Sequence, residues 1–219
     1  MLGDRRMMRL GLGALAAVTL AACQGDKPGR IGPGADASAA ARRTQRCSAA
    51  GVSTVIDSAG IGPVLRGERI AALATRCPVT DTALTLSEGA AERAHVVSVG
   101  DRPLVVLTTG TPDTSIIRVI TLDPAFKTAG GVGVGSSVQS LRLAHGTLCA
   151  AQGEGTFIVM AAGLPGVSFA IDWTPPASRD PAVAETPFPG GSPGAALDAA
   201  RITRAWVHGV SGACRVGVA

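Results

Sequence analysis

The side chains best suited to nucleophilic chemistry are a serine near the C-terminal end and the three histidines of the chain. Ser211 lies in the run Gly209-Val210-Ser211-Gly212-Ala213, which departs by one residue from the Gly-x-Ser-x-Gly turn that exposes a nucleophile between a strand and a helix. No helical pattern follows it. His95, His145 and His208 could serve as its base, but no carboxylate motif beside them completes a triad. We therefore predict no catalytic residue, and a hydrolase is the last of three hypotheses.

Two further patterns could bind phosphate or cleave a glycosidic bond. The glycine-rich stretch 130–135 would need a glycine in place of Ser136 to match a dinucleotide-binding fingerprint, and it lacks the Gly-Lys-Ser/Thr of a P-loop. Glu154 and Asp172 are the best acidic candidates, but no spacing of carboxylates argues for glycosidase chemistry, and Glu154 is expected at a hairpin tip. The stretch 130–135 therefore predicts a turn before a helix, and no cofactor is predicted.

The N-terminal residues have the pattern of an export signal. Arg5, Arg6 and Arg9 precede an apolar run at residues 10–22, and a basic segment before a short apolar run is typical of secretory signals. This run is too short for a permanent transmembrane helix, which takes about 20 residues. An ordinary secretory signal with a chance cysteine, or a buried core helix, is the alternative.

The end of the apolar run, Leu20-Ala21-Ala22-Cys23, resembles the lipobox of bacterial lipoproteins. The resemblance implies that residues 1–22 are a signal peptide and that Cys23 is acylated, with chains such as palmitate, and becomes the N-terminus. Two or three acyl chains anchor a protein stably, whereas one does not. Gln24 rather than aspartate follows the cysteine, which favours the outer membrane, facing the periplasm. The membrane is thus an expected partner through Cys23.

The other four cysteines are expected to form disulfides. Export would place Cys47, Cys77, Cys149 and Cys214 in an oxidising compartment, where an even number of cysteines indicates paired thiols. Three pairings are possible, and we favour Cys47–Cys77 and Cys149–Cys214 because each then joins residues within one half of the chain. A metal site would need close pairs such as Cys-x-x-Cys with histidines nearby, so no metal is predicted.

Charge excludes one class of partner. The sequence has 20 basic and 16 acidic side chains, a net charge of +4. Cleavage before Cys23 would remove three of the basic and one of the acidic side chains, which leaves 17 and 15 and a net charge of +2. A surface basic enough to bind nucleic acid is therefore not expected. Aromatic residues are 3% of the chain, so the core must consist of valine, isoleucine, leucine and alanine.

The chain divides into a tether and a region of alternating elements. Residues 23–46 are rich in glycine, proline, alanine, serine and arginine and show no helical or strand period, which predicts a flexible, lipidated tether. Arginines in this segment could contact lipid, although a solvated linker is favoured. We expect a first α+β repeat at residues 47–112 and a second at 113–219, with a proline- and glycine-rich loop at 174–200.

Each repeat is expected to hold one short helix and several strands. In the first, Ile70 and Leu73 have the spacing of a buried helix face within 68–77. In the second, Ser136 is expected to cap a helix, with Gln139 completing a capping box. β-Rich runs predict strands at 52–56, 83–86, 94–99, 104–109, 115–122, 147–151, 156–161, 167–172 and 202–208.

The two parts resemble one another at an offset of 68 residues, which places Gly67 on Gly135, Ile70 on Val138, and Leu73 on Leu141. A Gly-x-x-(Ile/Val)-x-x-Leu helix after a glycine-rich turn, followed by antiparallel strands and repeated, resembles the outer-membrane assembly lipoproteins of the SmpA/BamE type and the tandem-repeat β-lactamase inhibitor protein. The methionine usual after the glycine is Glu68 and Ser136 here. The resemblance implies an α+β fold of two tandem β-α-β-β(-β) units, with short helices packed on antiparallel sheet, and a habit of binding other proteins.

These expectations lead to three hypotheses for function. The first is a non-catalytic, lipid-anchored envelope protein that binds another envelope protein. The alternative is a small-ligand or peptidoglycan-binding module that uses a groove beside a glycine-rich turn. A hydrolase is the third.

Overall fold

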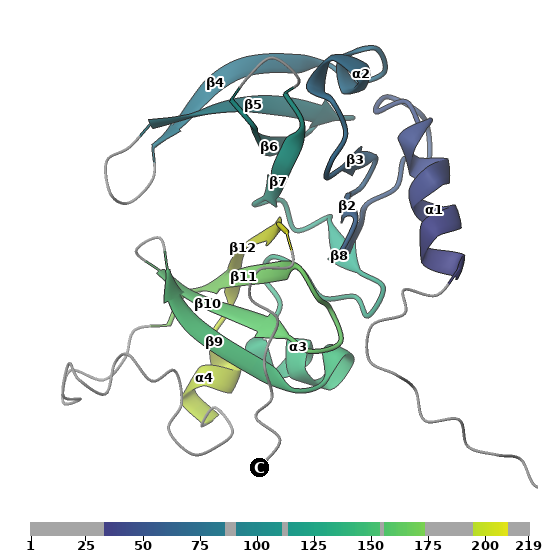
Figure 1. Cartoon of the computed structure of the whole chain (residues 1–219). Helices are drawn as coiled ribbons and strands as arrows, with labels where there is room; N and C mark the ends of the chain where they lie inside the picture. Colours follow the sequence, from purple (N-terminus) through teal and green to yellow (C-terminus); the bar gives the residue numbers. More distant parts are fainter. Residues whose placement is uncertain (1–32, 86–90, 111–113, 154–155, 174–194, 210–219) are drawn as a thin grey trace, which may run out of the picture. The chain divides into compact units, whose positions relative to one another are not determined.

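Antiparallel sheet dominates the chain, with a few short helices beside it (Figure 1). The computed structural model describes residues 33–85, 91–110, 114–153, 156–173 and 195–209. Its helices are α1 Pro33–Arg43, α2 Ile70–Ala74, α3 Val138–His145 and α4 Ala195–Ala199. The predicted α+β class is confirmed. The predicted signal peptide, Cys23, Glu154, Ser211 and Cys214 lie outside the described residues. No helix in the described ranges is long and apolar enough to cross a membrane.

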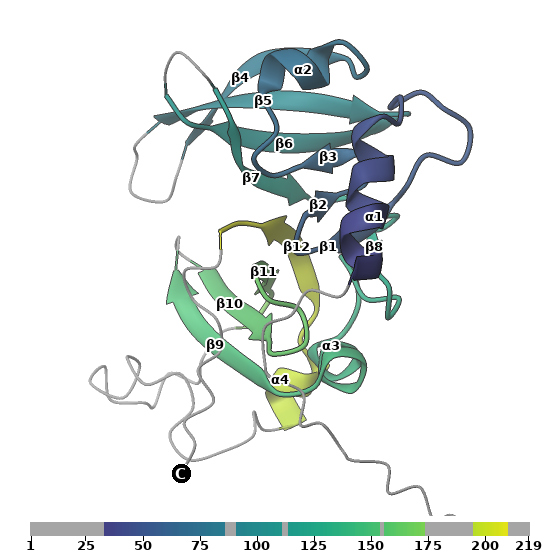
Figure 2. The ribbon, with the colours of Figure 1, turned by 45° about the vertical axis from the view of Figure 1, so that its right-hand side comes forward.

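Eight strands form one antiparallel sheet in the order β4-β5-β6-β7-β12-β11-β10-β9 (Figure 2). They are β4 Val79–Thr85, β5 Ala91–Val99, β6 Arg102–Thr108, β7 Ile116–Thr121, β9 Leu148–Gly153, β10 Thr156–Ala161, β11 Val167–Ile171 and β12 Ile202–Val207. Each corresponds to a predicted strand: β10 has the predicted bounds, and β4 begins four residues before the predicted 83–86. The last of the described strands, β12, lies in the middle of the sheet.

A second, smaller sheet has the order β3-β2-β1-β8. Its strands are β1 Val55–Asp57, β2 Gly60–Ile61, β3 Val64–Leu65 and β8 Lys127–Thr128. β1 and β8 pair in parallel, with Val55 opposite Lys127. The β2–β3 turn requires glycine, because Gly62 has a φ of +56° and a Cβ on Gly60 would lie 2.2 Å from the Val64 carbonyl oxygen.

Part of the predicted tether is a docked helix. Residues 33–43 form α1, and the Arg42 side chain near its end is buried. The Arg42 guanidinium donates to the Gly62 carbonyl at 3.0 Å and pairs with the Asp57 carboxylate at 2.6 Å. The prediction of a flexible tether is therefore wrong for 33–43, because Arg42 holds this segment against the small sheet.

Helix α2 is shorter than predicted, but the disulfide beside it is confirmed. The helix covers Ile70–Ala74 rather than 68–77, and Leu73 is its buried residue. Cys77 follows the helix and is bonded to Cys47, with their Cα atoms 4.9 Å apart. Cys149 is also disulfide-bonded; its partner lies outside the described residues, so the Cys149–Cys214 pairing stays a prediction.

Helix α3 begins one residue later than predicted. The Ser137 hydroxyl accepts a hydrogen bond from the Ser140 N–H at 3.1 Å and so caps the helix. The Ser136 hydroxyl instead accepts from the Gly133 N–H at 3.1 Å, in the turn before the helix. The predicted capping box with Gln139 is therefore wrong, because the residue three positions after the true cap is Ser140.

The last part of the predicted loop 174–200 is also helical. Residues 195–199 form α4, and the Asp198 carboxylate accepts a hydrogen bond from the Arg142 guanidinium of α3. Leu197 is buried in the main core, so α4 packs against the protein rather than belonging to an irregular excursion. Residues 174–194 lie outside the described ranges.

Candidate interaction surface

The eight-stranded sheet carries apolar side chains on both faces. Side chains alternate between the faces of a strand, and on one face Val106, Val119 and Phe169 belong to the main core. On the opposite face lies a separate cluster of Ile120, Ala170 and Trp206, with Leu84, Val105 and Ile158 packed against it. We call these six residues the outer-face cluster. A sheet face turned away from the core is commonly polar, so this cluster is the leading candidate for a binding surface.

The position of Leu84 shows that the sheet curves toward the outer-face cluster. Leu84 lies on β4, whereas the centre of the cluster lies on β7, β11 and β12. In a flat sheet the three spacings between β4 and β7 amount to about 14 Å, which is beyond the reach of a leucine side chain. The outer face is therefore concave. The half-buried Leu84, Val105 and Ile158 lie around a floor of more deeply buried residues.

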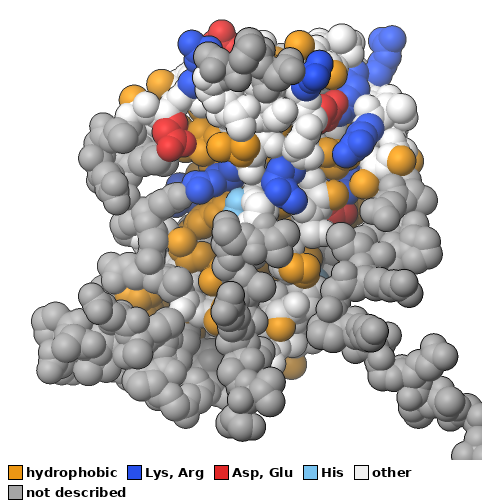
Figure 3. Space-filling view, in the orientation of Figure 1, with side chains coloured by type: hydrophobic (Ala, Val, Ile, Leu, Met, Phe, Trp, Pro, Cys, Tyr) orange, Lys and Arg blue, Asp and Glu red, His pale blue; other side chains and the backbone are white. Residues whose placement is uncertain are grey.

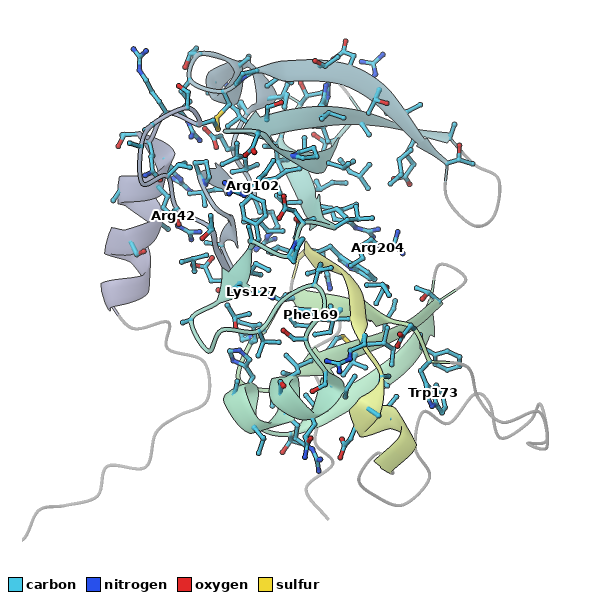
Figure 4. The ribbon with its side chains drawn as sticks, turned by 180° about the vertical axis from the view of Figure 1, so that it is seen from behind. Arg42, Arg102, Lys127, Phe169, Trp173 and Arg204 are labelled. Carbon is cyan, nitrogen blue, oxygen red and sulfur yellow. A yellow bond between two sulfur atoms is a disulfide. The ribbon has the colours of Figure 1, made fainter. Side chains whose placement is uncertain are left out.

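Charged side chains lie beside the apolar ones on this face. The Arg204 guanidinium is 5.0 Å from the centre of the Trp206 ring, a cation–π distance. Arg118 is opposite Leu107 in the register and Glu92 is opposite Leu84. Arg204 and its neighbour Phe169 project to opposite faces of the sheet (Figure 4). Figure 3 shows basic side chains among hydrophobic ones across the middle of its view.

A serine–histidine pair lies near the end of β12. The Ser168 hydroxyl is 2.6 Å from His208 Nε2, and His208 Nδ1 is 2.8 Å from the Gly209 carbonyl oxygen. Because a carbonyl can only accept, Nδ1 carries the proton and Nε2 can accept from the serine hydroxyl. Ser168 is only 2% exposed, so a substrate has little access to it. The sequence placed His208 only among three histidines that could serve Ser211, and it held no signal for Ser168, which the pairing of β11 with β12 brings to His208.

A second histidine constellation lies at the β4 end of the sheet. His95 Nδ1 is 2.8 Å from an Asp81 carboxylate oxygen, and His95 Nε2 is 3.5 Å from the Thr108 hydroxyl. The imidazole is buried, whereas the Asp81 side chain is 91% exposed. The Thr108 contact is at the limit of a hydrogen bond, so the threonine is poorly placed to be activated. Asp81 and His95 are cross-strand neighbours in the β4–β5 hairpin, a relation that the hairpin register alone could have revealed.

The two remaining candidate residues, His145 and Asp172, make hydrogen bonds that stabilise the fold. His145 Nε2 is 2.7 Å from the Thr128 hydroxyl, and burial lowers the pKa of His145 below its usual value. Asp172 accepts a hydrogen bond from the Arg201 N–H at 2.5 Å, between β11 and β12. In the described ranges no three histidine, cysteine, aspartate or glutamate side chains gather to hold a metal ion.

Comparison with known proteins gives little further guidance. No family model and no curated protein matches the sequence. Among solved structures, the chain is similar to the uncharacterized protein yfeY from Escherichia coli, at 17% identity and a TM-score of 0.42 over 76% of this chain and 100% of that one.

Proposed function

We propose that this chain is a non-catalytic binding module of the bacterial cell envelope, which binds another envelope protein through the outer-face cluster. The observation that carries the proposal is a second apolar cluster on a concave sheet face, separate from the main core. Apolar patches rimmed by polar residues mark interaction sites, those for other proteins among them. A membrane anchor at Cys23, on the outer membrane and facing the periplasm, belongs to the proposal and is supported by the lipobox-like sequence.

The burial of the polar residues favours binding over catalysis. Ser168 is the best-oriented hydroxyl among the described residues, since His208 can take its proton. Its exposure of 2% leaves it under its neighbours, and His208 Nδ1 contacts the Gly209 carbonyl oxygen. A hydrolase would need this serine to reach a carbonyl carbon, so we rank that function last.

The charges suggest what the partner presents. Arg204 covers one face of the Trp206 ring, so an acidic side chain of a partner could pair with this guanidinium while an apolar side chain contacts Ile158 or Val105. Trp206 is itself 3% exposed, so the partner would contact the Arg204 guanidinium and the half-buried Leu84, Val105 and Ile158 rather than the indole ring. We expect the binding segment to combine apolar and acidic residues.

We also propose that the domain consists of two tandem units, here placed at residues 55–121 and 127–207, in each of which one or more small-sheet strands and a short helix precede four strands of the large sheet. Support comes from backbone hydrogen bonds that recur around the two glycine turns: Gly67 N–H to Ile116 O at 2.7 Å and Gly135 N–H to Ile202 O at 2.8 Å. A second recurring pair is Ile70 N–H to Thr114 O and Val138 N–H to Ala200 O, both at 3.0 Å. In this assignment β7 closes the first unit, as β12 closes the second, rather than opening the second at residue 113.

The binding surface can be tested by site-specific photo-crosslinking of the full chain in its own envelope. A photoactivatable side chain in place of Ile158 or Val105 should give one adduct of the same mass. The matched control replaces Leu143, which is 81% exposed on α3 and is not part of the cluster. Adducts that are equally abundant from position 143, or retention on peptidoglycan sacculi with no protein adduct, would contradict the proposal.

A further inference from the structure

Strand β4 is an edge of the eight-stranded sheet with backbone groups directed outward. It pairs with β5 over seven consecutive residue pairs, from Val79↔Val97 to Thr85↔Ala91. The Ser98 N–H donates to the Pro78 carbonyl at 3.1 Å, which makes Val79↔Val97 a non-hydrogen-bonded pair of the ladder.

The alternation of the ladder then fixes which backbone groups point away from β5. They are the N–H and C=O groups of every second residue, namely Val79, Asp81, Ala83 and Thr85. Within the described part of the chain, none of these groups has a backbone partner on that side. Unpaired edges are a template for another strand.

The edge has few of the features that usually prevent strand addition. Proteins protect edges with proline, charged side chains such as lysine, or a bulge; the sequence Val-Thr-Asp-Thr-Ala-Leu-Thr of β4 has one charged residue, Asp81, and neither proline nor lysine. Its register with β5 is uninterrupted. Most of its side chains are exposed, so another strand can approach along its whole length.

We propose that β4 pairs with β4 of a second copy of this chain, antiparallel and centred on Thr82. In this register Val79 is opposite the partner's Thr85 and Asp81 is opposite the partner's Ala83. Every outward N–H and C=O group of both edges is then used, and the two eight-stranded sheets become one continuous sheet. On the outer face Thr82 lies opposite the partner's Thr82, and a pair of threonines across strands is favourable.

The sequence of β4 selects this register over its two neighbours. A shift of two residues in one direction would place Asp81 opposite the partner's Asp81, and like charges directly opposite one another are destabilising. A shift in the other direction centres the pairing on Ala83 and leaves Val79 without a partner. The self-complementary register centred on Thr82 is what favours a second copy over an unrelated strand as the occupant.

The register predicts a specific crosslink. Opposed residues of a non-hydrogen-bonded pair have Cα atoms about 4.5 Å apart, within the range of about 4.4–6.8 Å that a disulfide needs. In full-length chains oxidised mildly in the envelope, Thr82→Cys should give a disulfide-linked dimer. Thr80→Cys is the matched control, since it changes another exposed threonine on the same face of the same strand. In the proposed dimer the two residues at position 80 lie about 14 Å apart, so at least about tenfold less disulfide-linked dimer should form.

A second variant tests the role of the edge backbone. Ala83→Pro removes an outward N–H without removing a hydrogen bond to β5, a position where edge strands tolerate proline. In the Thr82→Cys background, Ala83→Pro should reduce the crosslinked dimer about tenfold, whereas Ala83→Ser, which keeps the N–H, should not.

Light scattering on the purified wild-type chain in detergent should give the mass of two protein chains. A monomer at every concentration, or equal crosslinking from positions 80 and 82, would overturn the proposal. So would a crosslink from position 82 to a protein of another mass, which would identify a different strand as the occupant. These outcomes do not depend on the partner of the outer-face cluster, so either proposal can fail alone.

Discussion

Removing one member of the buried Arg76–Glu68 ion pair should lower the free energy of unfolding more than removing both members together. The two side chains are 9% and 10% exposed. Arg76 Nη2 donates to both Glu68 carboxylate oxygens, at 2.7 and 2.6 Å. The same guanidinium donates to the Gln45 and Pro63 carbonyl oxygens, each at 2.9 Å. Arg76 thus joins Gln45, just before the disulfide, to the β2–β3 turn at Pro63 and to Glu68, just before α2.

The magnitudes follow from what each substitution leaves buried. Glu68→Leu leaves a buried guanidinium with two carbonyl partners, and breaking a buried pair in this way costs about 3–5 kcal/mol. Arg76→Met leaves a buried carboxylate and also takes the donor from two carbonyls, at about 1 kcal/mol each, so we expect about 5–7 kcal/mol. The double variant has no unpaired charge and loses only the carbonyl hydrogen bonds, or about 2 kcal/mol.

Denaturant unfolding of the wild-type chain, the two single variants and the double variant measures this cycle. Each free energy of unfolding is compared at an unchanged denaturant slope, and the coupling energy is the departure of the double variant from the sum of the singles. A double variant that costs as much as both singles combined would refute the reasoning, because the two charges would then act independently. A loss below about 1 kcal/mol for Glu68→Leu would mean that the pair behaves as an exposed one.

Three other predictions concern the disulfide, a histidine and the anchor. Replacing Cys47 and Cys77 together by serine should lower the free energy of unfolding by about 3–4 kcal/mol, because the bond joins residues with a sequence separation of 30; equal unfolding midpoints would contradict this. Burial lowers the pKa of His145 below 6.5, so the unfolded chain binds more protons there. The stability from neutral His145 is complete above about pH 6.5 and is lost as the pH falls through that value toward the lower folded pKa. A His145→Gln variant should therefore lose less stability than the wild-type chain in thermal melts between about pH 8 and 5, and identical pH profiles would exclude the effect. Cys23→Ser should abolish incorporation of labelled palmitate, and unchanged labelling would disprove the anchor.

The strands were predictable because their sequences are locally distinctive. β7 and β11 are nearly continuous apolar runs, and all five side chains of β11 are buried. Such runs indicate burial on both faces of a strand, so the existence of a second apolar face could have been inferred from residues 167–171. The order of the strands could not, because the place of β12 between β7 and β11 depends on backbone pairs with residues far away in the sequence.

The polar pairs were missed for a related reason. Asp81 meets His95, and Ser168 meets His208, only through the register of neighbouring strands. For the first pair, the antiparallel pairing of β4 with β5 would have been enough to predict the contact. For the second, the pairing of β11 with β12 was needed, which the sequence does not specify. Nothing in residues 23–46 indicates the buried Gly62 carbonyl that Arg42 contacts, so their composition predicts a solvated linker.

The central place of β12 has a consequence for how the chain matures. β12 is the last described strand in the sequence, yet it joins β7 on one side and β11 on the other. Until residues 202–207 emerge, the strands from β4 to β7 and those from β9 to β11 can form only two separate sheets, each with an open edge where β12 belongs. In a chain exported as proposed, both edges would stay open until residues 202–207 have crossed the membrane. Premature termination before residue 202 should therefore yield aggregating fragments rather than a shortened, folded protein.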